Sequence, residues 1–248
     1  MNDSNNNNSL LLAHLQKFDT CSISNVVATY PENEKLCLGL YHPWNSNWYT
    51  DSTCRSMFPE LGPRAGYAVT VTFGLPDSAG SRMSMKDLLF AIANAPKPVI
   101  LVIHQNFPEH LKKKNGLCGG NMATAFGSLG VTGIISDGPS RDLNEVRALG
   151  IQYILTGSCA GHGAFSVEEI NTPVSVCGMS VCPGEIIHMD ENGAVKFPSD
   201  HLEEVIRLSE KLHKYEQEKQ KNLSRYNSPD LLAQILSDQF QAKDGDMS

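Results

Sequence analysis

The 248-residue sequence predicts an α/β fold in which strands alternate with helices. Three observations support this prediction. Apolar segments of strand length recur along the chain, segments with helical spacing lie between them, and glycine turns separate the two kinds. The strand, helix, strand succession from 98 to 157 is typical of parallel strands joined by helical connections. We therefore expect one mixed core with helices covering a face of its sheet.

The first part of the chain is expected to open with disorder and to reach the sheet after an irregular segment. Residues 1–8 are rich in asparagine and of low complexity, which is typical of disorder. Residues 30–63 are rich in Pro, Asn, Trp and Tyr and show no regular period. The expected elements are helices at 9–18 and 22–27, a strand at 66–73, a helix at 85–95 and a strand at 98–104.

The second part is expected to complete an α/β core over residues 9–199 and to end in a helical tail over 200–248. The expected core elements are a helix at 119–130, a strand at 131–136, a helix at 142–149, a strand at 151–157 and short antiparallel strands from 174 to 198. The tail pattern predicts one charged helix at 200–219, a polar break at 220–227 and a second helix that starts at Ser228-Pro229. The tail has too few apolar residues for a domain, so we expect it to dock on the core or on a neighbouring subunit.

Composition excludes some classes of function. A net charge of −7 argues against general binding to nucleic acid or to anionic membranes, because both require a basic face. No apolar run approaches the roughly 18 residues of a membrane span, and the N-terminus lacks a basic signal region. Seven cysteines without CxxC spacing predict reduced thiols, with Cys177 and Cys182 as small buried side chains. The expected compartment is cytoplasmic.

The stretch ISDGPSRDLNEVRALG, at 135–150, places Arg141 and Asp142 where a strand turns into a helix. In the structural interpretation, Asp142 caps the helix and Glu145 completes a capping box. In the functional interpretation, the carboxylate holds a divalent cation and the guanidinium binds an anionic substrate oxygen. Local sequence leaves both interpretations open, although only the second gives Arg141 a role.

A second candidate is the turn Gly119-Gly120-Asn121-Met122. Glycines permit close backbone approach, and the free N–H groups of the following helix suit a carboxylate or phosphate. The alternative is an ordinary tight turn. Its position one strand–helix unit before Arg141 favours the binding site.

Other polar residues allow simpler interpretations. His162, between two glycines, is a candidate acid or base, with a solvated loop residue as the alternative. His104 is expected to be a satisfied core residue at a strand end, and Asp137 to stabilise the turn before Pro139. The run Lys112 to Lys114 is expected to be a solvated helix end.

Together these segments resemble the RraA-like family, named for a regulator of ribonuclease E activity. The resemblance rests on the glycine turn, on DGPSRD, on LNEVRALG and on VCGMSVCPGEIIHMDENGAVKFP. The resemblance is specific across 116–198 and looser across 18–104. The irregular segment at 30–63 and the tail lie outside it. It implies a swivelling β/β/α fold that assembles as trimers or hexamers with active sites between subunits.

The family also contains metal-dependent 4-hydroxy-4-methyl-2-oxoglutarate aldolases that can decarboxylate oxaloacetate. The resemblance therefore implies a lyase that acts on a small 2-oxo acid through a pyruvate enolate and requires Mg²⁺ or Mn²⁺. The roles that the resemblance implies are metal binding by Asp142, substrate binding by Arg141 and binding of the pyruvate carboxylate by the amides around Asn121 and Met122. The residues themselves add Gly119 and Gly120 to the expected substrate-binding turn. They also place His162 beside Arg141 as an expected catalytic residue.

Two departures from the family's patterns leave alternatives open. Aldolase members are expected to carry Asp at the place of Gly120, whereas the founding regulators tend to lack the Asp that this sequence keeps at Asp142. One alternative is a non-catalytic oligomer that binds and regulates a protein partner. Another is a related enzyme for a different substrate, with His162 or Glu145 as the acid–base group.

Overall fold

The computed structural model describes residues 2–28, 35–44, 47–76 and 83–238. Its helices are α1 (Asn2–Leu15), α2 (Thr20–Val27), α3 (Met85–Asn94), α4 (Glu109–Lys112), α5 (Gly120–Gly127), α6 (Leu143–Ala148), α7 (Leu202–Arg225) and α8 (Pro229–Leu236), with short 3-10 turns at Pro59–Leu61 and Ser199–His201. Its strands are β1 (Arg55–Ser56), β2 (Arg64–Gly74), β3 (Val99–Asn106), β4 (Val131–Ser136), β5 (Gln152–Leu155), β6 (Ser166–Ile170), β7 (Val174–Val176), β8 (Met179–Val181), β9 (Ile186–Asp190) and β10 (Gly193–Phe197).

One mixed sheet organises the core, in the order β1-β5-β4-β3-β2-β9-β10. Strands β2 to β5 are parallel to one another, and the outer strands run antiparallel. The long strand β2 pairs with β9 through its first residues and with β6 through its last, so the sheet curves around it. The α/β fold class expected from the sequence is confirmed.

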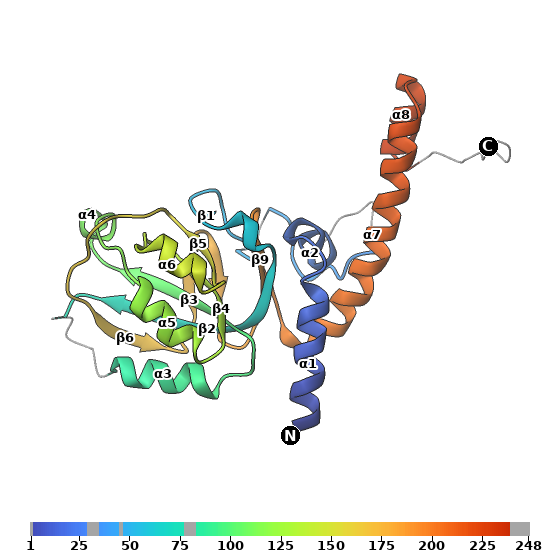
Figure 1. Cartoon of the computed structure of the whole chain (residues 1–248). Helices are drawn as coiled ribbons and strands as arrows, with labels where there is room; N and C mark the ends of the chain where they lie inside the picture. The colour runs from blue at the N-terminus through green and yellow to red at the C-terminus, as the bar shows by residue number, and fades with distance from the viewer. Residues whose placement is uncertain (1, 29–34, 45–46, 77–82, 239–248) are drawn as a thin grey trace.

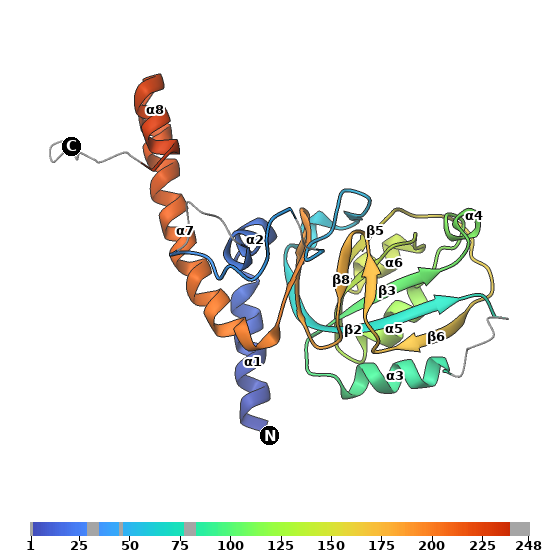
Figure 2. The same ribbon diagram turned by 180° about the vertical axis from the view of Figure 1, so that it is seen from behind.

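Helices cover one face of this sheet, and a small hairpin covers the other (Figures 1 and 2). Alternation along β3 shows why both faces are apolar. Val99, Leu101 and Ile103 pack with buried residues of α3, α5 and α6. Ile100 and Val102 point the other way and pack against the β7–β8 hairpin. The sheet is therefore buried on both sides, and polar groups concentrate where its strands end.

The terminal helices form a third layer against β9 and β10, and α7 and α8 extend beyond the core as an arm (Figure 1). Helix α1 includes the asparagine run, for which composition predicted disorder. Leu12 and Leu15 are fully buried there, and the Asn8 side-chain amide donates to the Tyr67 hydroxyl at 3.0 Å. Packing of the apolar end extends the helix through a segment of weak propensity.

Two details of the tail differ from the sequence expectation. Helix α7 continues to Arg225, so the predicted break at 220–227 is shorter than expected. Gln, Lys, Leu and Arg in this stretch are good helix formers, which explains the extension. Ser228 does occupy the N-cap position with Pro229 at the first helical turn, although its hydroxyl makes no capping bond.

The cysteine expectation is wrong for one pair. Cys54 and Cys177 form a disulfide that joins the segment before β1 to the β7–β8 turn. The two residues are separated by 123 positions, so only the folded chain brings them together. Cys182 is exposed rather than buried. Within the described ranges, every helix is too short or too polar to span a bilayer.

Candidate functional site

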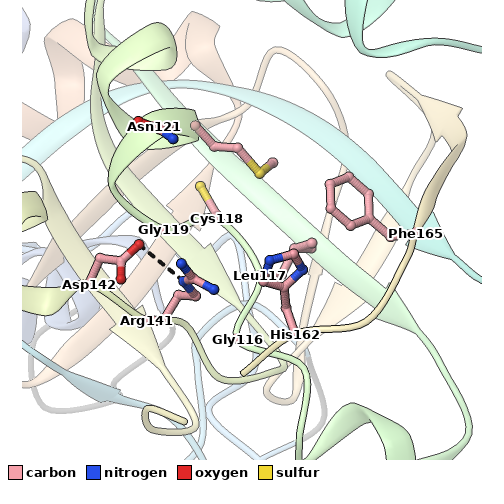
Figure 3. Close-up of a pocket in the computed structure, with 10 residues that line it drawn as sticks. Gly116, Leu117, Cys118, Gly119, Asn121, Arg141, Asp142, His162 and Phe165 are labelled. Atoms are coloured by element: carbon pink, nitrogen blue, oxygen red, sulfur yellow. Dashed lines mark hydrogen bonds and ion pairs between the residues drawn. The ribbon is translucent and has the colours of Figure 1, made fainter. Parts of the chain in front are cut away.

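A cavity of about 240 Å³ lies at one end of the parallel strands, on the helix-covered side (Figure 3). Of the seven residues that the sequence predicts for the site, six line this cavity, and Gly120 is the exception, next to Gly119. The lining residues are Gly116, Leu117, Cys118, Gly119, Asn121, Met122, Arg141, Asp142, His162 and Phe165. The structure thus brings together residues from three separate loops.

The order of the strands explains this convergence. Strands β3, β4 and β5 are parallel neighbours, so their carboxyl ends lie at the same edge of the sheet. The chain after β3 leads to α5, the turn after β4 leads to Arg141 and α6, and the loop after β5 carries His162. Ser140 locks the central turn, since its Oγ donates to the Cys118 carbonyl at 2.9 Å and its amide to the Gly157 carbonyl at 3.1 Å.

Asp142 does not cap its helix, so the capping-box interpretation is wrong. It occupies the N-cap position in a left-handed conformation with φ 56°, and its side chain makes no capping bond. Oδ2 instead accepts hydrogen bonds from the Gly120 amide and from Arg141 Nε, both at 3.1 Å. These two bonds, led by the Gly120 amide, lower the pKa of the carboxyl below its ordinary value. Asp142 is therefore an anion at neutral pH.

Arg141 keeps most of its donors available. The only hydrogen bond that its side chain makes among the described residues runs from Nε to Asp142, which fixes the guanidinium plane beside the cavity. The terminal nitrogens have no partner within the described part of the chain. Figure 3 shows the guanidinium between Asp142 and His162. A planar fork with two free nitrogens suits a carboxylate or an enolate oxygen.

The first turn of α5 supplies backbone donors to the same cavity. Gly119 is the N-cap and has no side chain to satisfy the following amides. The N–H groups of Asn121 and Met122 have no acceptor among the described residues, as is usual for a helix N-terminus. A Cβ at Gly119 would lie 2.9 Å from Arg141 Cγ and would also meet the Asp142 carboxylate. Only glycine allows this close approach.

His162 lies at the open side of the cavity on the loop before β6. Its side chain is exposed, and Nδ1 lies 3.0 Å from the Gly163 carbonyl. A proton on Nδ1 would donate to that carbonyl and leave Nε2 as an acceptor. Two hydrogen bonds anchor the loop on either side of His162. The Gly116 amide donates to the Gly161 carbonyl at 2.9 Å, and the Gly163 amide donates to Asn115 Oδ1 at 3.1 Å.

Sequence reasoning missed four lining residues, which are Gly116, Leu117, Cys118 and Phe165. Cys118 has φ 61°, and burial raises the pKa of its thiol to about 12, although a hydrogen bond between the thiol and the Tyr153 hydroxyl lowers it in part. The thiol is therefore protonated and serves as an apolar wall. The sequence feature that could have identified Cys118 as a lining residue is its position two residues before Gly120. Nothing in the local sequence marks Phe165.

Among the described cavity residues, the one carboxylate that could contribute to a hard cation of the magnesium type is that of Asp142. Within the described residues no group of three or more His, Cys, Asp or Glu side chains is arranged for a metal ion. Mg²⁺ usually binds through one or two carboxylates and completes its shell with water and substrate oxygens. Asp142 offers an ionised carboxylate whose Oδ1 has no partner among the described residues. A zinc site, which needs several nitrogen or sulfur ligands, does not fit.

Three residues outside the cavity behave differently from the expectations stated for them. The Asp137 carboxylate accepts from His104 Nδ1 at 2.7 Å, from Lys112 Nζ at 2.6 Å and from the Gln105 amide at 2.8 Å. His104 is one-third exposed rather than a core residue, and Lys112 is largely buried rather than solvated. The three meet because β3 and β4 are adjacent, which local patterns do not reveal.

Two proteins with known sequences resemble part of this chain. A relative from Methanocaldococcus jannaschii, described as uncharacterized, is 32% identical over 97 residues, which are 39% of this chain and 47% of that one. A Thermus thermophilus protein named 4-hydroxy-4-methyl-2-oxoglutarate aldolase is 29% identical over 86 residues, 34% of this chain and 52% of that one. The aligned stretches thus span about half the length of these two relatives.

Two solved structures share the fold at low identity. An uncharacterized protein from Pseudomonas syringae has a TM-score of 0.68 at 18% identity and covers 91% of this chain and 92% of its own. Streptomyces coelicolor RraAS2, described as an unusual member of the RNase ES inhibitor RraA family, has a TM-score of 0.60 at 18% identity, covering 88% and 97%. Both likenesses concern the fold alone.

A family model described as RraA-like, Aldolase/RraA, matches residues 40–196. The match takes in the last part of the irregular segment at 30–63, which the sequence motifs had left outside. It also contains every residue of the cavity. The chain therefore belongs to the RraA-like family.

Proposed function

We propose that this protein is a divalent-metal-dependent lyase that cleaves a small 2-oxo acid at the cavity in Figure 3. One observation supports this most strongly. The ionised carboxylate of Asp142 is fixed by the Gly120 amide and by Arg141 Nε, and this leaves the terminal nitrogens of Arg141 beside free helix amides. An anion-binding turn, a cation and a metal-type carboxylate thus share one wall.

Substrate binding uses the helix terminus. The carboxylate of a 2-oxo acid would accept hydrogen bonds from the amides of Asn121 and Met122, where the helix dipole also favours negative charge. Arg141 would then donate to the 2-oxo oxygen. The cavity of about 240 Å³ is small, which suits a substrate of a few carbon atoms.

The bond to be broken lies between C3 and C4 of the substrate. Loss of the 4-hydroxyl proton forms a carbonyl at C4, and the electrons of the C3–C4 bond move to the 2-oxo group as pyruvate enolate. Arg141 stabilises the charge that develops on this oxygen, and pre-positioned charges of this kind are effective in a desolvated site. A bound divalent cation would add Lewis-acid stabilisation of the same oxygen. Oxaloacetate would give the same enolate with loss of carbon dioxide.

A proton must leave the 4-hydroxyl and another must return to C3. His162 is the histidine that lines the cavity, and its Nε2 is available when Nδ1–H donates to the Gly163 carbonyl. We assign this transfer to His162. The lining thiol of Cys118, with its pKa raised to about 12, remains protonated and cannot serve as the base.

The test is pyruvate release from oxaloacetate and from 4-hydroxy-4-methyl-2-oxoglutarate, with Mg²⁺, with Mn²⁺ and with chelator. Wild type is compared with Arg141→Ala and with Arg147→Ala, a matched control whose guanidinium lies on the exposed face of α6. Because oxaloacetate loses carbon dioxide spontaneously, the rate without enzyme at each metal concentration is subtracted. We expect metal-dependent turnover that falls about 100-fold or more in Arg141→Ala and persists in Arg147→Ala.

A second function, binding and regulation of a protein partner, is favoured by the arm formed by α7 and α8 (Figure 1). Leu236 of α8 is 62% exposed there. If neither substrate is turned over with any metal, the lyase proposal is wrong. Purification of a specific complex that depends on residues 226–238 would then support the partner function.

A further inference from the structure

A second cavity, of about 410 Å³, lies beyond the turn at 137–142 that also forms the first. Asp137, Gly138 and Pro139 line this one, whereas Arg141 and Asp142 line the other. Its remaining lining residues are Thr53, Glu109, Lys112, Lys113, Thr156, Gly157, Ser158 and Cys177. It therefore occupies the carboxyl ends of β4 and β5, a common ligand position in open α/β sheets. The lyase proposal does not use it.

Charges at the base of this cavity are held in place by one another. Asp137 is 12% exposed and Lys112 is 17% exposed, and their charged atoms are 2.6 Å apart. His104 donates to the same carboxylate oxygen at 2.7 Å. Burial raises the pKa of Asp137. The hydrogen bonds from His104, Lys112 and the Gln105 amide together lower this pKa by more, so the net shift is downward. The carboxylate is ionised and its accepting capacity is largely used.

The unused hydrogen-bonding capacity is on the donor side. An ammonium group carries three N–H donors, and Lys112 Nζ uses one of them within the described structure. Lys113 pairs with Glu109 at 3.1 Å on the surface and likewise retains donors. The hydroxyls of Thr156 and Ser158 have no protein partner among the described residues. The two carboxylates of the wall are thus paired, while ammonium and hydroxyl donors remain free.

The wall that carries these donors is fixed before any ligand binds. Gln105 is buried, and its Nε2 donates to Ser136 Oγ at 3.1 Å and to the Pro139 carbonyl at 3.3 Å. A Cβ on Gly138 would overlap this amide, so the turn packs directly on it. A fixed cavity with donors in excess favours binding of an oxyanion, because less ordering is needed on association.

We propose that this second cavity binds a small ligand through an oxyanionic group, phosphate or carboxylate, held by Lys112, Lys113 and the hydroxyls of Thr156 and Ser158. Its volume lies within the usual range for small-molecule sites and exceeds what a free inorganic ion requires. Lysine ammonium groups act as point charges for both kinds of oxyanion. Contact of the 137–142 turn with both cavities places this ligand next to the proposed active site.

The experiment is a titration of the full chain with inorganic phosphate, glycerol 3-phosphate and succinate at low ionic strength, followed by the amide shifts of Gly138, Gly157 and Ser158. Succinate carries carboxylates only, so the comparison shows which oxyanion is preferred. We expect saturable shifts at these three amides. Lys113→Gln, a surface change that leaves the Asp137 cluster intact, should raise Kd about tenfold, as should Lys112→Gln.

Lys114→Gln is the matched control, because Lys114 is the exposed neighbour in the same run and does not line the cavity. It should change Kd less than about twofold, because its charge lies outside the cavity lining and is screened by solvent. Arg141→Ala separates the two cavities. It should lower lyase turnover about 100-fold or more but leave phosphate or succinate binding at Gly157 and Ser158 unchanged.

Three outcomes would overturn the proposal. They are the absence of saturable shifts with all three probes, an equal loss of affinity in Lys114→Gln, and shifts confined to Asn121 and Met122 that disappear in Arg141→Ala. The third outcome would assign anion binding to the first cavity and would support the lyase site. If the wild-type protein shows no lyase turnover but binds the probes at the second cavity, the lyase proposal is wrong and the present proposal is supported.

Discussion

The carboxylate of Asp142 accepts a 3.1 Å hydrogen bond from the amide of Gly120, which lies 22 residues earlier in the chain. This contact joins the first turn of α5 to the start of α6. It explains the left-handed backbone at Asp142, which turns the side chain away from its own helix. The contact therefore fixes a carboxylate, rather than a helix cap, at the cavity wall.

Replacing Asp142 by Asn should separate charge from structure. Asparagine tolerates the left-handed conformation, and its side-chain oxygen can still accept from the Gly120 amide. We expect kcat/KM for pyruvate release to fall about 100-fold or more, with a melting temperature close to that of wild type. Asp142→Ala should melt earlier, because alanine is strained at this φ. Full activity in Asp142→Asn would contradict the proposed metal-binding role.

Gly119→Ala should impair the site without unfolding the protein. The added methyl would meet Arg141 Cγ and the Asp142 carboxylate, so both side chains must move. We expect a loss of about tenfold or more in kcat/KM, since small displacements of positioning groups are costly. Gly161→Ala is the matched control, because nothing lies within 4 Å of a Cβ there. Equal activity in both variants would argue against a role for this close approach.

Gly120 and Glu145 should be energetically coupled. A Cβ at Gly120 would meet the Glu145 carboxylate, which lies over this position. Gly120→Asp should therefore lower the free energy of unfolding by about 1 kcal/mol, through crowding and like-charge repulsion. In a Glu145→Ala background the same change should be neutral or stabilising, because an acidic residue suits the first turn of a helix.

A double-mutant cycle measures this coupling by thermal or denaturant unfolding. Glu145→Gln combined with Gly120→Asp is the control, because it keeps the volume at 145 and removes only the charge. Simple additivity of the two changes would show that the Glu145 side chain moves away from Gly120 at no cost.

The buried His188 should make the fold sensitive to mild acid. Desolvation is the main cause that lowers its pKa to about 4, from an ordinary value of 6.5. Between these values the unfolded chain binds a proton that the folded protein excludes. The free energy of unfolding should therefore fall as the pH drops from 6.5 to about 4, by roughly 3 kcal/mol from this group.

Denaturant unfolding at several pH values checks this effect. The slope over this range should be shallower in His188→Gln, which cannot take up the proton. Ser209→Ala, a change at another buried polar residue, removes no titrating group and should keep the wild-type slope. Identical slopes in wild type and His188→Gln would show that another group causes the loss of stability.

Much of the candidate site was predictable from the sequence because parallel strands place their carboxyl ends together. The glycine turn at 119–122 and the pair Arg141-Asp142 each follow a strand, and adjacent strands bring their loops to one edge. Two patterns that are weak alone thus predicted one site when they were combined. The roles of these residues in catalysis and metal binding remain predictions for the experiments above.

The sequence could not show which partners the polar side chains choose. Asp142 and Glu145 have the spacing of a capping box, yet the Gly120 amide competes successfully for the carboxylate. His104 and Asp137 each had an adequate local explanation, and their hydrogen bond crosses 33 positions of sequence. Local rules describe what a residue can bind, whereas the strand order decides what is near.

The sequence by itself determined the α/β class and the main helices and strands, because hydrophobic period and turn chemistry are local properties. It also predicted six of the residues that line the first cavity. The tertiary structure alone decided the Asp142–Gly120 contact, the Cys54–Cys177 disulfide and the second cavity with its Asp137 cluster. Each of these joins segments that lie far apart in the chain. Their proximity follows from the pairing of strands and the packing of loops, and so it exists only in the folded protein.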